Sequence, residues 1–135
     1  MTKHYVAYHN VDRMERPLSD GDPTRVISKS SFTRLLGHTV WMIVGQTVEG
    51  AKRKRFTLGC VFLVNDVGDA EEGEFKHYAR GTGNVFKPAP VLNDESWFDE
   101  FRLKSRSFEG VQPIAEGMHL AELKRISAAA GYVVK

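Results

Sequence analysis

Short apolar and aromatic runs, spaced along the first two thirds of the chain, predict a β-rich domain. Residues 4–10, 39–45 and 56–65 are strand-length segments rich in β-branched and aromatic side chains. The run at 56–65 is apolar on both alternating faces, which is typical of a strand in the middle of a sheet. Residues 25–29 and 74–80 predict two further strands. We therefore expect a sheet with 56–65 at its centre.

Turn-forming residues separate these predicted strands. Residues 11–24 contain two prolines, a glycine and several aspartates, which predict a long loop. Residues 30–36 predict a helical turn. The acidic segment 66–73 and the glycine-containing segment 81–84 predict turns on either side of strand 74–80.

The last third of the chain shows helical periodicity. Asn93 or Asp94 can cap a helix in which the aromatic residues of 97–101 share one stripe. A second helix is expected over 116–130, with Gly131 at its C-terminal cap. Together with the strands, these helices predict an α+β domain with a curved mixed β-sheet or a partly closed β-barrel and flanking helices.

The length and composition indicate one folded unit. The chain has 135 residues, of which 41% are hydrophobic and 27% charged, and it contains no repeat or linker that would divide it. We expect a single domain over residues 1–135. Its net charge of +2 permits nucleic-acid binding without arguing for it, so a phosphate-binding surface would have to come from local clustering.

The single cysteine and the absence of long apolar runs bear on location. Cys60 lies in an apolar strand, which fits a buried thiol in a reducing cytoplasm. No apolar run approaches the roughly 20 residues of a membrane helix, and the first residues lack the apolar core of a signal peptide. We therefore expect a cytoplasmic protein that is not inserted in a membrane.

Common enzyme motifs are missing from the sequence. There is no phosphate-binding loop, no dinucleotide fingerprint and no nucleophile elbow. The five histidines have no metal-ligand spacing. We expect no catalytic residue, metal or cofactor, and favour a non-enzymatic protein. A small-molecule-binding domain, or a small enzyme with His9, His38 or His77 as acid and base, is the second hypothesis.

Aromatic residues on predicted strands and at a helix start could line a pocket. Tyr8, Trp41 and Trp97 are among them, and Asn10 or Asn84 could supply an amide. Stacking on aromatic rings, combined with hydrogen bonds to the base edge, is how unpaired or flipped bases are held. Core packing is the competing interpretation for each ring.

A basic run lies between two predicted strands. Lys52, Arg53, Lys54 and Arg55 follow one another in the connection 46–55. They form either a solvated hairpin tip or a set of phosphate contacts, which would position nucleic acid without reading its sequence.

Several segments together resemble the PUA-like superfamily, and EVE-type domains most of all. The segments are the aromatic strand ending in an amide at 5–10, the glycine followed by a tryptophan-bearing strand at 37–44, and the strand at 59–64. Residues 92–98 and 110–114 look like the closing part of EVE-like chains. The resemblance implies a partly closed PUA-like barrel over the whole chain.

The resemblance also implies a function. EVE-like and related domains are nucleic-acid readers, several of them for modified bases, and some are fused to nucleases. Carried over by position, Asn10, Trp41 and Trp97 would lie near a base pocket. Because this chain has no nuclease segment, cleavage would require a separate partner.

Our first hypothesis is therefore a non-enzymatic domain that binds DNA or RNA, with a modified base in an aromatic pocket. A protein-interaction module using the helix near Trp97 is a third hypothesis. The sequence leaves the oligomeric state open.

Overall fold

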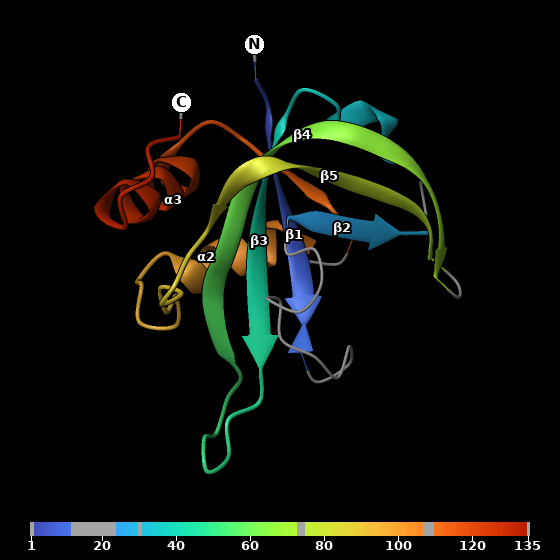
Figure 1. Ribbon diagram of the computed structural model, residues 1–135. Coiled ribbons are helices and arrows are strands. Elements are labelled where there is room, and N and C mark those ends of the chain that lie inside the picture. Colours follow the sequence, from blue (N-terminus) through green and yellow to red (C-terminus); the bar gives the residue numbers. More distant parts are fainter. Residues whose placement is uncertain (1, 12–23, 30, 73–74, 107–109, 135) are drawn as a thin grey trace.

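The computed structural model describes residues 2–11, 24–29, 31–72, 75–106 and 110–134 (Figure 1). Most of the predicted loop 11–24 lies outside these residues. The described elements, in chain order, are β1 (His4–Asn10), β2 (Arg25–Ser28), η1 (Thr33–Leu35), β3 (Thr39–Gln46), β4 (Arg55–Glu72), β5 (Phe75–Val85), α2 (Phe98–Lys104), β6 (Gln112–Ile114) and α3 (Met118–Ala129).

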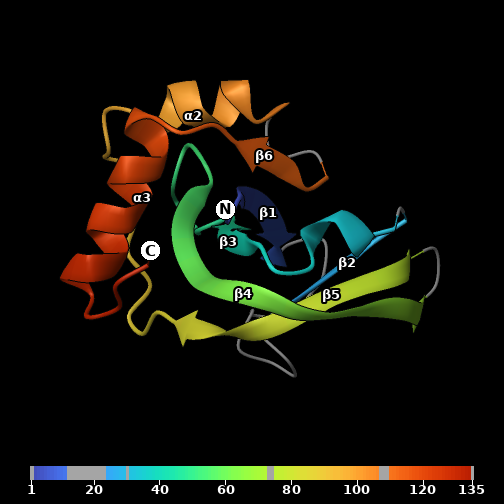
Figure 2. The same ribbon diagram turned by 90° about the horizontal axis from the view of Figure 1, so that it is seen from above.

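The described strands form one mixed sheet in the order β2-β5-β4-β3-β1-β6. β1 runs parallel to β3, and the other neighbouring strands are antiparallel. Figure 2 shows α2 and α3 on one side of the sheet, with η1 and β2 inside its curl. The predicted α+β class and curved mixed sheet are confirmed. The six strands do not close into a barrel.

The long pair β4 and β5 corrects two sequence predictions. The acidic segment expected to be a turn at 66–73 continues β4 as far as Glu72, and the turn expected at 81–84 lies within β5. Gly81 and Gly83 pair with Val64 and Phe62. At both glycines the backbones approach so closely that an added Cβ would meet a carbonyl oxygen of β4 within 2 Å. The glycines therefore permit close strand pairing instead of a turn.

The sheet separates two hydrophobic cores. A register shift between Met42 and Ile43 places Leu58 and Cys60 on opposite faces of β4. The helix-side core consists of Val6, Trp41, Ile43, Phe56, Leu58, Val61, Phe86, Leu92, Trp97, Phe98, Phe101, Leu120, Leu123 and Ile126. The inner core consists of Tyr5, Ala7, Val26, Phe32, Leu35, Val40, Met42, Cys60, Phe62, Val64 and Ala79. As expected, the Cys60 thiol is buried.

Both predicted helices are present, but the start and the cap of the first one differ from the prediction. α3 lies within the predicted range 116–130, and Gly131 follows it with φ +94°, the left-handed geometry that favours glycine. α2 begins later than expected, because Trp97 is its N-cap residue and contributes no side-chain cap. The predicted cap Asn93 instead contacts β4.

Candidate functional site at the base of the β3–β4 hairpin

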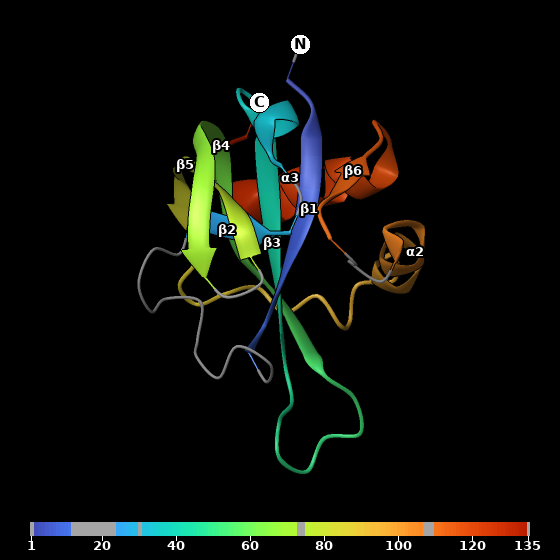
Figure 3. The same cartoon turned by 90° about the vertical axis from the view of Figure 1, so that its right-hand side faces the viewer.

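The β3–β4 hairpin carries the basic run away from the body of the domain (Figure 3). Lys52, Arg53 and Arg55 are exposed, whereas Lys54 is half-buried. Arg53 pairs with Asp99 of α2, with a guanidinium nitrogen 3.1 Å from a carboxylate oxygen. The predicted run therefore presents several cations to solvent and is tied to α2 at its base.

The end of β1 lies beside this hairpin base. Asn10 pairs with Gly45, and Gly45 pairs with Phe56, so the three residues form one row across the sheet. Lys54 Nζ donates a hydrogen bond to Asn10 Oδ1 over 3.3 Å. The predicted amide and the predicted basic run thus meet at one place, although they are far apart in the sequence.

Tyr8 lies across the same row. A Cβ added at Gly45 would overlap the Tyr8 hydroxyl oxygen, so the phenol occupies the space that a larger residue would fill. The Tyr8 ring centroid is 6.2 Å from that of Phe56. The glycine in β3 therefore allows an aromatic ring to lie close to the sheet next to Asn10.

Phe56 and Arg102 complete what we call the hairpin-base cluster, defined as Tyr8, Asn10, Lys54, Phe56 and Arg102. The Arg102 guanidinium carbon lies 4.8 Å from the centroid of the buried Phe56 ring. This is cation–π geometry. The cluster thus combines two cations, one amide and one phenol with the buried Phe56 ring.

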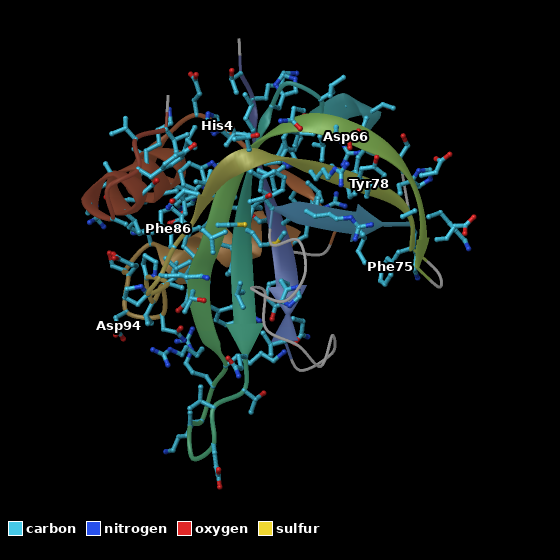
Figure 4. All side chains as sticks on the ribbon, viewed as in Figure 1. His4, Asp66, Phe75, Tyr78, Phe86 and Asp94 are labelled. Carbon is cyan, nitrogen blue, oxygen red and sulfur yellow. The ribbon has the colours of Figure 1, made fainter. Side chains whose placement is uncertain are left out.

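Asn93 holds the hairpin base in place. Its Oδ1 accepts a hydrogen bond from the Phe56 backbone N–H at 2.6 Å, and its Nδ2 donates to the Lys54 carbonyl oxygen at 2.8 Å. Figure 4 marks the neighbouring Asp94 on the hairpin side of the molecule. The linker before α2 therefore holds the backbone of Lys54, which immediately precedes β4, and of Phe56 within β4.

Trp41, a predicted base-pocket residue, lies away from this cluster. Its side chain is fully buried in the helix-side core, and its Nε1 donates to His4 Nδ1 over 3.0 Å. His4 lies at the opposite end of the domain from the hairpin (Figure 4). In this position the indole offers no face on which a base could stack.

The buried His4 side chain gives a test by pH. Burial lowers the pKa of His4 below its ordinary value of 6.5, and the charge of Lys124 acts in the same direction. The unfolded chain therefore takes up a proton near pH 6.5, while folded His4 stays neutral to lower pH. We expect the free energy of unfolding to decrease as pH falls below about 6.5.

Urea unfolding at pH 7.5 and 5.5 would measure this loss. A His4→Gln variant keeps a hydrogen-bond acceptor for Trp41 but does not titrate, so its stability should change less between the two pH values. An equal decrease in the free energy of unfolding of the wild type and of His4→Gln between the two pH values would contradict the role assigned to His4.

Trp97 is also in the core. It is 5% exposed, and its ring packs against Phe98, Phe101 and His119. Its Nε1 is buried without a hydrogen-bond partner. The aromatic stripe of this region thus faces inward. Leu103, 75% exposed, is the exposed apolar residue of α2.

The histidines of the enzyme hypothesis lie apart. His9 is next to the hairpin-base cluster, and His38 precedes β3 at the other end of the β1–β3 pair. His77 is in β5, where its Nδ1 is 3.7 Å from Asp69. The structure does not bring these three side chains together.

A cleft of about 250 Å³ lies between α2 and the start of α3. It is smaller than a typical cavity for a drug-sized ligand, about 300–1,000 Å³. His119 lines it with Nε2 3.8 Å from Glu100 Oε1, and the Lys104 ammonium lies 3.0 Å from the same oxygen. The bond from Lys104 lowers the pKa of Glu100. The Glu100 carboxylate is thus already paired.

The described residues form neither a metal-binding group nor a membrane-spanning helix. Within the residues described above, no three His, Cys, Asp or Glu side chains are grouped so that they could hold a metal ion. Neither α2 nor α3 is long and apolar enough to cross a membrane, and the described residues form no other helix that could.

Two residues of the cluster were less evident from sequence. From the sequence, Phe56 is part of the central strand predicted over 56–65, and Arg102 is one of several cations that could join the basic run in contacting phosphates. The signal that could have singled out Arg102 is its spacing from Asp99, one helical turn earlier, which places both on one face of α2.

Comparison with known proteins identifies no relative of this chain. No protein-family model, no curated protein and no solved structure matches the chain.

Proposed function

We propose that this domain binds nucleic acid at the hairpin-base cluster. The observation that carries the proposal is the 3.3 Å contact between Lys54 and Asn10, which joins a base-reading amide to the basic hairpin. Lys52 and Arg55, both exposed, extend the positive surface along the hairpin. Cations of this kind contact phosphates and fix the orientation of the nucleic acid.

A base would lie beside Tyr8 and Asn10 in this proposal. Tyr8 supplies a ring face or edge, and Asn10 supplies a donor and an acceptor for a base edge. The resemblance to PUA-like and EVE-type domains supports a modified base as the preferred ligand. In this proposal Trp41 and Trp97, both buried in the helix-side core, do not contact the base.

Charge reversal on the hairpin tests the phosphate contacts. The salt dependence of binding is the slope of log K against the logarithm of the salt concentration. We expect the double variant Lys52→Glu/Arg55→Glu to reduce the magnitude of this slope by about 1.5 to 2, because each lost phosphate contact means that roughly one counterion fewer is released on binding. Fluorescence anisotropy at several salt concentrations, with single- and double-stranded DNA and RNA, measures the slope.

The matched control is Lys3→Glu/Lys76→Glu, which changes the net charge equally. Both lysines are exposed and lie away from the hairpin, before β1 and in β5. Equal slopes for the two double variants would remove the hairpin from the interface. Oligonucleotides with and without modified cytosines and adenines form a second arm, and equal affinities would remove the base-reading part of the proposal.

A further inference from the structure

Arg102 differs from the other arginine of the helical layer. Its side chain is half-buried, and its Nε is buried without a hydrogen-bond partner. Arg125 of α3 instead pairs with Glu122 at 2.7 Å and with Glu95 at 3.4 Å. None of the ion pairs among the described residues includes Arg102. A half-buried guanidinium without a counter-ion is costly, and a bound anion would offset that cost.

Two contacts place Arg102 beside the hairpin base. Its guanidinium lies on the Phe56 ring, and the pairing of Asp99 with Arg53 attaches the same face of α2 to the hairpin base. A guanidinium carries a planar set of hydrogen-bond donors. This arrangement suits the oxygens of a phosphate, which arginine binds with two parallel hydrogen bonds.

The neighbouring groups favour an anion over a cation. Lys54 lies two residues before Phe56 and extends to Asn10, whose pairing row also contains Phe56. The Tyr8 hydroxyl lies over the same row. These groups are an ammonium, an amide and a hydroxyl, and Asp99, one helical turn before Arg102 on α2, is paired with Arg53.

We infer that Arg102 and Lys54 form a binding site for a single phosphate group, with Arg102 as the principal anchor. A phosphodiester of a nucleic-acid backbone and the phosphate of a free nucleotide present the same chemistry to this site. The backbone form of the inference rests on the proposed function, and the free-nucleotide form does not.

Nuclear magnetic resonance of the arginine Nε–Hε groups tests the site directly. The full chain would be titrated with inorganic phosphate, with adenosine 5′-monophosphate, and with adenosine as a control that lacks phosphate. We expect a saturable shift of the Arg102 Hε resonance with the first two ligands and none with adenosine. The Arg125 resonance should stay constant, because its carboxylate partners already occupy it.

Variants separate binding from stability. Arg102→Gln should weaken binding of adenosine 5′-monophosphate at least tenfold. Arg102→Lys, which keeps the charge but loses the paired donors, should weaken it by a smaller factor. Arg125→Gln serves as the control and should bind as the wild type does. The spectra of all three variants report whether the fold is retained.

The outcomes distinguish this site from the proposed function. Shifts at Arg102 with phosphate and nucleotide, but no binding of oligonucleotides, would support the phosphate site and contradict nucleic-acid binding. Oligonucleotide binding that Arg102→Gln leaves unchanged, with no phosphate shift at Arg102, would overturn the phosphate site alone. A lower melting temperature of Arg102→Gln with unchanged nucleotide affinity would likewise overturn it and leave Arg102 as a packing residue.

Discussion

Trp41→Ala is expected to lower the free energy of unfolding by about 3–5 kcal/mol, the usual cost of removing a large aromatic side chain from a core. The indole is fully buried between β3 and the helices, so its removal leaves a cavity in the helix-side core. The truncation also removes the hydrogen bond to His4. Equilibrium unfolding in urea at pH 7.5, followed by circular dichroism, measures the loss.

Leu103→Ala is a suitable control for this experiment, because Leu103 is 75% exposed and a surface substitution usually changes stability by less than about 0.5 kcal/mol. A Trp41→Ala protein with wild-type stability would contradict the core assignment. If such a protein also lost its affinity for nucleic acid, that result would assign Trp41 to the binding site.

Gly83→Ala is expected to cost at least about 2 kcal/mol, because it forces two paired strands apart. An added Cβ would lie 1.9 Å from the Val61 carbonyl oxygen and 2.6 Å from the Phe62 Cα. Both contacts are with backbone, which cannot turn aside as a side chain can. Thermal unfolding of the variant would measure the loss of stability, and the amide resonances of β4 would report the disturbance of its pairing with β5.

Gly68→Ala provides the matched comparison within β4. There an added Cβ meets the ring of Tyr78 at 3.0 Å. Tyr78, marked with Asp66 in Figure 4, is a partly exposed side chain that can move by a few tenths of an ångström. Gly68→Ala should therefore destabilise less than Gly83→Ala, and the reverse order would refute the close-approach explanation.

The sequence predicted well the elements whose pattern is local. β1 and β3 follow from their aromatic and β-branched runs, and α3 from its helical spacing. The extension of β4 was missed because Asp66 and Asp69 suggested a turn. In the structure Val67 packs against the inner core and Ala70 is buried, whereas the Asp69 side chain is 95% exposed, so this acidic segment is a strand with one side toward solvent.

The candidate site depends on contacts that no local pattern encodes. Asn10 and Lys54 were selected separately from sequence, but their meeting results from the register of β1 on β3 and of β3 on β4. Trp41 and Trp97 were selected because tryptophan often lines pockets. Their burial results from how the helices cover the sheet, which the composition of a segment does not reveal.

The length of β4 has a consequence for how the domain opens. The strand supplies Phe56, Leu58 and Val61 to the helix-side core, and Cys60, Phe62 and Val64 to the inner core. Neither core can be exposed to solvent without disturbing the backbone that the other shares. Amide protons protected by either core should therefore exchange through one common opening event, so the two layers act as a single foldon.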